Sequence, residues 1–370
     1  MTKQVLLVEP FLGGSHQQWA TGWRANSRHS IEIIGHAGDS WRWRMRGGSV
    51  SLARQAAEIV AREGIPDVVM STDMLDLASF AGISRGWSGG VALVHYLHEN
   101  QLTYPRQPGE PVDVGLAWMT WRSLVTADEI WCNSTFHREA LRGALDSFVH
   151  EVPDESHEDE LRQVGTKLVT MPVGVDSLRL IARSSGPANR RPLVISNQRW
   201  HHDKDLGSVL RALVKASEAG HQFDVALLGD DTGGEAETLA PLVERLGDRV
   251  IARGHLPRPD YEDMLARADV VVSAARNEFF GIAVVEAVAA GAWPVLPNSL
   301  AYPEIIESPF HQLSLYEPGG LGVLLRSALT KAAAGERPPS ALSESMARFD
   351  WSIVAAAYDD RIDELSAART

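Results

Sequence analysis

The sequence contains a single cysteine, Cys132, among 370 residues. One thiol allows neither an internal disulfide framework nor a cysteine-rich metal site, and such scarcity is typical of a reducing compartment. Long apolar runs are also missing, and the first residues lack the basic start and small-residue cleavage site of a signal peptide. We therefore expect a soluble, cytoplasmic protein without membrane association.

Positive charge is scarce as well. Lysine and arginine number 35 against 48 aspartates and glutamates, which gives a net charge of −13. The overall field therefore repels nucleic acid and anionic membranes, and a polyanionic partner would need a local basic patch. Segments 41–46 (WRWRMR) and 182–192 (ARSSGPANRRP) are the two candidates, whereas the acidic segment 151–160 is typical of a solvated surface loop. No protein partner is inferred.

The sequence is rich in short, continuously apolar segments that alternate with amphipathic ones. Such segments predict parallel strands buried on both faces, each followed by a helix. The predicted strands are 4–10, 31–35, 66–71, 91–97 and 129–134, then 192–198, 223–230, 249–254, 268–274 and 292–298. Two such groups predict an α/β protein with two doubly wound, Rossmann-like domains.

The segment 182–192, rich in Gly, Pro, Ser and Arg, predicts the linker between these domains. We place the N-terminal domain at 1–184 and the C-terminal domain at 185–350. Residues 351–370 have apolar side chains at helical spacing, which predicts a final helix that packs back on the N-terminal domain.

Charged residues interrupt the apolar segment 276–298, directly after a predicted strand. Gly281 and Ile282 lie where the next helix should begin, and the free amides of a helix N-terminus suit a diphosphate. Glu286, in the following turn, could accept paired hydrogen bonds from a ribose diol, and Glu278 could bind sugar hydroxyls. The alternative is that both glutamates are surface charges.

Arg199 and Lys204 follow another predicted strand. A planar guanidinium and an ammonium ion together suit a departing diphosphate, on which negative charge grows as the bond to it breaks. The histidine pairs in segments 95–98 and 201–203 lack a third ligand at suitable spacing, so we predict no metal site.

The spacing Glu278-x7-Glu286, with Arg199 and Lys204 upstream, resembles the signature of retaining GT-B glycosyltransferases of the glycosyltransferase 4 type. Segment 172–176 (PVGVD) resembles that family's PNGVD turn, with Val173 in place of Asn. The phrases EPFLGGSH, WRWRMRG, YLHENQLTYP, NQRWHHDK, GHLP, NEFFGIAVVEAVAAG and PVLPNSLAYPEI resemble, in order from residue 5 to about 306, the tRNA-queuosine alpha-mannosyltransferase family and its bacterial relatives.

This resemblance implies a GT-B fold, in which an acceptor-side domain and a nucleotide-sugar domain face a central cleft. It implies transfer of mannose from GDP-mannose to a hydroxyl of the queuosine cyclopentene ring in tRNA, with retention of configuration and without a metal or a permanently bound cofactor. The residues implied as catalytic are His98, Glu278, Arg199 and Lys204.

The resemblance also divides the binding residues between the two substrates. The implied donor residues are Gly13, Gly14, Arg199, Lys204, Gly254, His255, Leu256, Phe280, Gly281, Ile282 and Glu286. The implied acceptor residues are Ser15, His16, Trp41, Arg42, Trp43, Arg44, Glu99 and Asn100. Alternating tryptophans and arginines suit base stacking beside phosphate contacts.

Simpler structural explanations remain open for several of these residues. The tryptophans of segment 41–46 could pack on the domain while its arginines pair with acids, and the glycine pair could form only a tight turn. His98 could be a buried, hydrogen-bonded histidine, and a structural role is favoured for His95. At the level of function, the alternatives are another donor sugar, a small-molecule or lipid acceptor, and a non-catalytic nucleotide-sugar or tRNA-binding protein.

Overall fold

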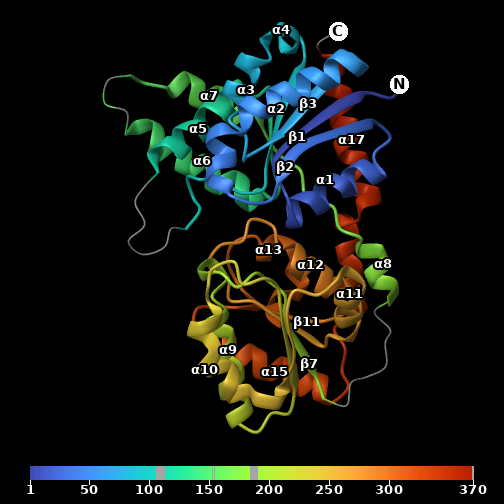
Figure 1. The fold of residues 1–370 in the computed structure, drawn as a ribbon. Helices are drawn as coiled ribbons and strands as arrows, with labels where there is room; N and C mark the ends of the chain where they lie inside the picture. The colour runs from blue at the N-terminus through green and yellow to red at the C-terminus, as the bar shows by residue number, and fades with distance from the viewer. Residues whose placement is uncertain (106–112, 152, 154, 184–190, 369–370) are drawn as a thin grey trace. The chain divides into compact units, whose positions relative to one another are not determined.

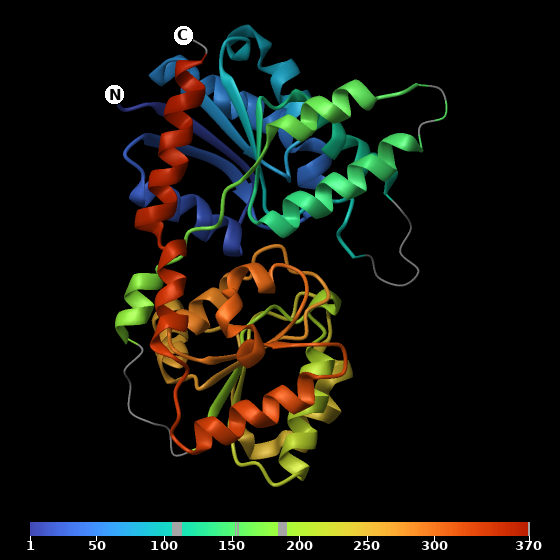
Figure 2. The same ribbon diagram turned by 180° about the vertical axis from the view of Figure 1, so that it is seen from behind.

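The computed structural model describes residues 1–105, 113–151, 153, 155–183 and 191–368. The chain divides into two compact units, which are Met1–Gly174 together with Trp351–Thr370, and Val175–Asp350. Each unit is an α/β layer structure with helices on both faces of its sheet (Figures 1 and 2). None of the helices in the described ranges is both long enough and apolar enough to cross a membrane.

The first unit is built on a six-stranded parallel sheet with the order β2-β1-β3-β4-β5-β6. Its strands are β1 (Gln4–Leu12), β2 (Ser30–Ala37), β3 (Val68–Thr72), β4 (Ala92–Leu97), β5 (Glu129–Cys132) and β6 (Leu168–Thr170). Its helices are α1 (Gly14–Asn26), α2 (Trp41–Glu63), α3 (Leu77–Ile83), α4 (Arg85–Ser88), α5 (Val114–Thr126), α6 (Thr135–His150), α7 (Glu158–Lys167) and α17 (Trp351–Ala367).

The second unit has a six-stranded sheet with the order β12-β11-β10-β7-β8-β9, also parallel. Its strands are β7 (Leu193–Ser196), β8 (Asp224–Leu228), β9 (Val250–Gly254), β10 (Val270–Val272), β11 (Trp293–Pro297) and β12 (Leu315–Tyr316). Its α-helices are α8 (Ser177–Arg183), α9 (Leu206–Glu218), α10 (Ala236–Leu246), α11 (Arg258–Arg267), α12 (Ile282–Ala289), α13 (Tyr302–Ile305), α14 (His311–Ser314), α15 (Leu321–Ala333) and α16 (Ser340–Glu344). The short 3₁₀ turns are η1 (His202–Lys204), η2 (Gly247–Arg249), η3 (Ser308–Phe310) and η4 (Ser345–Phe349).

The predicted α/β class is confirmed, and every predicted strand segment contains a strand. The edge strands β6 and β12 were not predicted because they are too short to form a recognisable apolar run. The predicted boundary lies after residue 184, but the units divide earlier, between Gly174 and Val175. The reason is that α8 packs against α12 of the second unit. Residues 184–190 of the predicted linker lie outside the described residues.

Two surface segments differ from their sequence interpretation. The basic segment 41–46 opens helix α2, so its alternating residues point to successive positions around a helix. The acidic segment 151–160 includes the first turn of α7, where Glu158, Asp159 and Glu160 lie favourably at the positive end of the helix dipole.

Helix α17 is part of the first unit through buried aromatic and polar contacts. The indole of Trp19 donates to the Tyr358 hydroxyl at 3.2 Å, and that hydroxyl donates to the carbonyl of Pro172 at 2.6 Å. Trp351, the first residue of α17, lies against Gly22 of α1 and against Gly174. A Cβ atom at Gly22 would lie 2.4 Å from the Trp351 ring, so only glycine leaves room for the indole.

We predict that Gly22→Ala destabilises the protein by about 1–3 kcal/mol, the usual cost of overpacking a core. The clash should outweigh the gain of about 1 kcal/mol that alanine normally brings to a helix interior. Urea denaturation measures this difference. The control is Gly143→Ala in α6, where a Cβ meets nothing within 4 Å and the variant should be as stable as the parent or more so. Equal stabilisation by both substitutions would contradict the prediction.

Candidate functional site

The loops after β7 and β10 are joined at their backbones in the second unit. The carbonyl of Asp203 accepts hydrogen bonds from the amides of Arg276 at 2.7 Å and Asn277 at 3.2 Å. Lys204 donates from Nζ to the Asn277 carbonyl at 2.6 Å and lies 3.2 Å from Oε2 of Glu278. Because β7 and β10 are neighbouring parallel strands, these loops emerge at the same edge of the sheet and bring Lys204 and Glu278 together.

Glu278 is further held by a polar network that sequence reasoning missed. Gln198 donates from Nε2 to Glu278 at 3.0 Å and to the Tyr302 hydroxyl at 3.1 Å. Ser273 donates to Oε1 of Gln198 at 2.7 Å, which fixes the orientation of the amide. The Glu278 side chain is 16% exposed, so its carboxylate is positioned by the protein while part of it stays open to a ligand.

Asp203 is a buried carboxylate beneath Lys204. Its Oδ1 lies 2.6 Å from Nδ1 of His201, and its Oδ2 lies 3.3 Å from Nζ of Lys204 without hydrogen-bond geometry, so the second contact is a charge interaction. Burial alone would raise the pKa of Asp203, but Lys204, His201 and Arg199 hold it below its ordinary value. Asp203 is therefore an anion that supports the ammonium group of Lys204.

The predicted helix start after β10 is confirmed. Gly281 is the N-cap of α12 with φ of 98°, a left-handed conformation that favours glycine. A Cβ there would also lie 3.2 Å from Ile305 and 3.4 Å from Glu278. No described side chain caps this N-terminus, so the first amides of α12, beginning at Ile282, can donate to an anion.

Glu286 is 5% exposed on α12, so the interpretation of a surface charge is wrong for this residue. Arg258 donates from Nη1 to Oε1 at 2.6 Å, and the Tyr261 hydroxyl donates to Oε2 at 2.8 Å. Asn197 in turn donates to the Tyr261 hydroxyl at 2.9 Å. Because a carboxylate offers about four acceptor positions, two remain for a ligand such as a diol.

Arg258 and Tyr261 were also missed, because their contact with Glu286 spans more than twenty residues of sequence. Of the implied donor residues, Gly254 ends β9, and His255 and Leu256 lie in the short loop between β9 and α11, which begins at Arg258. Gly254 has φ of 88°, which makes the sharp turn out of β9. His255 is exposed, and Phe280 is buried against Phe349, so Phe280 has a packing role.

A second cluster lies in the first unit, at the carboxyl ends of β1 and β4. Glu9 is fully buried, and its Oε2 lies 3.1 Å from Nδ1 of His16 and 3.8 Å from Nε2 of His98. The two imidazole rings are 4.1 Å apart between centroids, and Trp19 packs edge-on against His98 at 4.7 Å. Sequence reasoning found both histidines and missed Glu9, because it lies inside an apolar strand.

The remaining implied residues of this loop group have clear structural partners. Asn100 accepts at Oδ1 from the amides of Leu102 and Thr103, and its Nδ2 lies 3.0 Å from Nε2 of His137. Asn100 therefore shapes the loop, while neighbouring Glu99 is half-buried. His95 is buried 2.7 Å from the Ser71 hydroxyl, and burial lowers its pKa to about 3, which agrees with the structural role favoured for it.

Gly13 serves a backbone contact in the structure. A Cβ at Gly13 would lie 2.9 Å from Cα of Gly38. The absence of a side chain therefore lets the β1–α1 loop contact the backbone of the loop before α2. Gly14 has φ of 53° and open space around it, and Ser15 is exposed beside it. The close approach expected at Gly13 is therefore to the protein's own backbone.

The aromatic and basic residues at the start of α2 have two different surroundings. Trp41 is half-buried on the apolar cluster of Met45, Met74, Leu116 and Met119. Trp43 is 74% exposed. Arg42 stacks its guanidinium over the Trp41 ring at 4.7 Å, while Arg44 pairs with Asp39 at 2.8 Å. Trp43 and Arg42 are thus exposed, Arg42 while it also contacts Trp41, and Trp41 and Arg44 have further structural partners.

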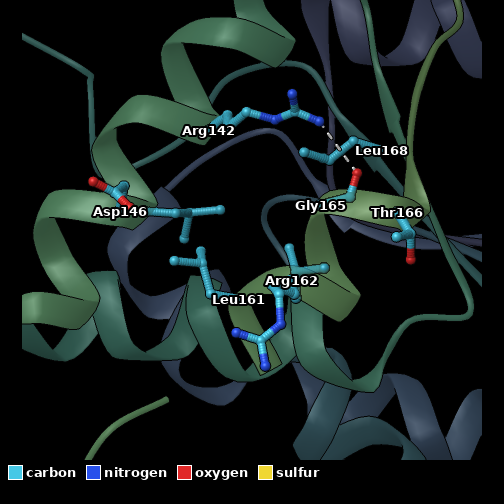
Figure 3. Close-up of a pocket in the computed structure, with 9 residues that line it drawn as sticks. Arg142, Asp146, Leu161, Arg162, Gly165, Thr166 and Leu168 are labelled. Atoms are coloured by element: carbon cyan, nitrogen blue, oxygen red, sulfur yellow. Dashed lines mark hydrogen bonds between the residues drawn. The ribbon is translucent and has the colours of Figure 1, made fainter. Parts of the chain in front are cut away.

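A separate pocket of about 470 Å³ lies between α6, α7 and the start of β6 (Figure 3). Leu145, Leu161, Val164 and Leu168 form its apolar lining, and Arg142 donates across it to the Gly165 carbonyl at 3.4 Å. None of the site residues predicted from the sequence lines this pocket.

Glu9, His16 and His98 place three possible ligand atoms within 4.8 Å of one another, although the sequence predicted no metal site. Glu9 lies in β1, His16 in α1 and His98 directly after β4, so spacing along the chain did not reveal their approach. The contact of His16 with Glu9 has hydrogen-bond length and geometry, which places a proton between these two atoms. We therefore describe Glu9 and His16 as a hydrogen-bonded pair, with the His98 ring packed beside it.

Comparisons with known families match both parts of the chain. Residues 4–175 match the family model described as tRNA-queuosine alpha-mannosyltransferase N-terminal, and residues 179–319 match that described as glycosyl transferases group 1. A tRNA-queuosine alpha-mannosyltransferase of Drosophila melanogaster is 29% identical over 310 residues, which cover 81% of each chain.

Solved structures are similar over nearly the whole chain. The catalytic domain of starch synthase IV from Arabidopsis thaliana, bound to ADP and acarbose, has a TM-score of 0.71 at 12% identity, over 99% of this chain and 100% of that one. Sucrose-phosphate synthase from Thermosynechococcus elongatus has a TM-score of 0.69 at 16% identity, with the same coverage. At such low identity these matches bear on the fold alone, and they confirm the predicted GT-B fold of two Rossmann-like domains.

We predict that Asp203→Asn lowers the free energy of unfolding by about 1–3 kcal/mol at pH 7, because it removes a buried hydrogen-bonded charge next to Lys204. The pKa of Asp203 is lowered in the folded state, so its stabilisation is complete above the ordinary value near 4 and is lost as pH falls through the lower folded value. Urea denaturation at pH 7 and below pH 4 measures both effects. The exposed Asp248→Asn is the control, and an equal loss in the two variants would contradict the prediction.

Proposed function

We propose that the chain, which matches the tRNA-queuosine alpha-mannosyltransferase N-terminal model and a group 1 glycosyltransferase model, is a member of the tRNA-queuosine alpha-mannosyltransferase family. In this proposal it transfers mannose from GDP-mannose to a hydroxyl of the queuosine cyclopentene ring in tRNA, with retention of configuration. The class of enzyme, glycosyltransferase, follows from the matches to both parts of the chain. The donor, the acceptor and the stereochemistry are the proposed steps beyond that class.

The observation that carries the proposal is the set of groups around the N-terminus of α12. Lys204 and Glu278 lie 3.2 Å apart beside the uncapped first turn, and Glu286 lies buried within the helix. The helix amides and Lys204 supply donors for a diphosphate, Glu278 supplies acceptors for sugar hydroxyls, and Glu286 supplies acceptors for a ribose. Together these groups match the three parts of a nucleotide sugar.

In the proposed reaction, the bond from the sugar C1 to the diphosphate oxygen breaks, and its electron pair leaves with the diphosphate. The acceptor oxygen bonds to C1 on the same face, and its proton passes to the departing phosphate. Lys204, Arg199 and the α12 amides stabilise the growing negative charge, so we propose that the leaving group departs without a metal. Glu278 orients the sugar, and His98 is proposed as a further substrate-binding residue.

For the acceptor, support comes from the exposed start of α2. Trp43 offers an aromatic face for stacking an unpaired base, and the exposed Arg42, which packs over Trp41, is proposed to contact phosphate. Since the chain carries a net charge of −13, tRNA binding would depend on this local surface and should weaken with salt.

We predict that the purified protein adds one hexose to queuosine in tRNA when it is supplied with GDP-mannose, and not with UDP-glucose or UDP-galactose. Mass spectrometry of nucleosides from the treated tRNA detects the product directly. Addition from a different donor would show that the proposed donor sugar is wrong. Donor hydrolysis without addition to queuosine would point to another acceptor. Neither hydrolysis nor transfer with any of the three donors would overturn the proposed reaction.

Glu278→Ala serves as the variant control in this assay. If Glu278 acts on the sugar, the variant should lose transfer by on the order of 100-fold or more and keep GDP binding within a few-fold, because the diphosphate donors remain. Equal loss of GDP binding and transfer would instead assign Glu278 to the structure of the loop that holds Lys204.

We predict that Trp43→Ala weakens tRNA binding by about tenfold, because stacking on an aromatic side chain contributes about 1–3 kcal/mol per base. Filter binding with queuosine-containing tRNA measures the change, and GDP binding should stay the same. The matched control is Val50→Ala, which removes another exposed apolar side chain from α2. If both variants bind tRNA as the parent does, the acceptor surface lies elsewhere.

A further inference from the structure

Glu9 is a charged residue at a position where the fold would accept an apolar one. It lies in β1 with no exposed surface, and its Oε1 accepts from the Phe11 amide at 2.9 Å and from the Thr72 hydroxyl at 3.1 Å. Its Oε2 contacts Nδ1 of His16 at 3.1 Å. A buried carboxylate is costly unless donors surround it, and these three donors point inward from three different segments.

Within the described part of the chain, the hydrogen bond of the His16 ring is made by Nδ1. Nδ1 faces Glu9, and Glu9 is its hydrogen-bond partner among the described residues. The side chain keeps 11% of its surface exposed, so the ring is not sealed in the core. Contact between Gly13 and Gly38 fixes the loop that leads into His16. The imidazole is therefore a preorganised group with its Nε2 edge available to a ligand.

His98 stacks on His16, yet its environment is different. Its Nε2 is buried without a hydrogen-bond partner, and it lies 3.8 Å from Glu9, beyond hydrogen-bond reach. Trp19 and Tyr96 surround the ring at 4.7 and 4.9 Å between centroids. Enzymes often place two titratable groups side by side in different environments, so that one is charged and the other is neutral at the same pH.

We propose that Glu9 and His16 form a buried carboxylate–imidazolium pair that binds a substrate oxygen bearing negative charge, with Glu9 as the positioning residue and His16 as the residue that touches the substrate. This inference rests on the proposed transfer reaction. In that reaction His16 donates a hydrogen bond from Nε2 and keeps its proton, while the electron pair and the acceptor proton move to the phosphate as described above.

The titratable groups that face His16 come from several elements. They are Glu9 of β1, Asp73 after β3, Glu99 after β4, and the neighbouring imidazole of His98. Burial raises the pKa of Asp73 to about 8, so Asp73 is largely neutral at pH 7. Burial lowers the pKa of His16, but Glu9, Asp73 and Glu99 together raise it to about 9. Burial and the charge of His16 lower the pKa of His98 well below its ordinary value. His16 is thus charged below pH 9, and its contribution to transfer should be lost as pH rises through that value.

The test compares Glu9→Gln with Glu129→Gln in the full chain. Glu129 is also buried in the first unit, paired with Arg361 and bonded to Trp131, so its substitution removes a buried charge away from the histidines. Glu9→Gln should lower kcat for transfer by on the order of 100-fold, while the affinity for GDP stays within a few-fold of the parent value. It should also move the alkaline limb of the pH profile of transfer below pH 7. Glu129→Gln should leave that limb in place.

NMR titration of the His16 ring in the unmodified protein supplies a measurement that needs no activity. A midpoint near pH 9 that falls in Glu9→Gln supports the pair even if the acceptor or donor proposed above is wrong. A midpoint at or below 6.5 overturns it, as does a Glu9→Gln variant whose pH profile matches that of Glu129→Gln. Transfer lost with a chelator and restored by Zn²⁺ would also overturn it, because a metal ion would then replace the shared proton.

Discussion

Parallel pairing of β7 with β10 is the constraint on which the donor-side chemistry depends. It sends two loops, which start about eighty residues apart in the chain, from the same edge of the sheet. The Asp203 carbonyl then ties them together through the amides of Arg276 and Asn277. Once that tie is made, Lys204 reaches Glu278 without any further rearrangement. The short backbone contact therefore determines the site more directly than any single charged side chain.

The same geometry places Glu9, Asp73 and His98 in the first unit, where β1, β3 and β4 are successive neighbours. Asp73 and His98 lie just after the carboxyl ends of their strands and Glu9 lies in the second half of β1, so side chains separated by about ninety residues meet. The amide of His98 donates to Oδ1 of Asp73 at 2.9 Å, which links two of these ends directly. Both units thus gather polar residues at one sheet edge, as parallel α/β sheets generally do.

The sequence was sufficient for the ten longer strands and for polar groups that follow them, because continuous apolar runs and strand-end polar residues are local signals. Lys204, Glu278, Gly281 and Glu286 were identified as candidates in this way. Gln198, Arg258 and Tyr261 were not, since each contacts a partner distant in sequence, and Glu9 was not, since it lies inside an apolar strand. The start of α2 was interpreted as alternating residues, and only its helical geometry separates exposed Trp43 from Trp41 on its apolar cluster.

Both clusters pair a cation with a carboxylate, Lys204 with Glu278 at 3.2 Å and His16 with Glu9 at 3.1 Å. Pairing lowers the net attraction for an anion, so neither cluster is built to capture anions by charge alone. It does fix where each donor points: Lys204 has three ammonium hydrogens and contacts Glu278 and the Asn277 carbonyl, which leaves one for a ligand. Donors that are held in place before binding lose little freedom when charge develops on a ligand, and this preorganisation favours the transition state over simple affinity. A chain with a net charge of −13 can in this way stabilise negative charge on a ligand through a few oriented donors.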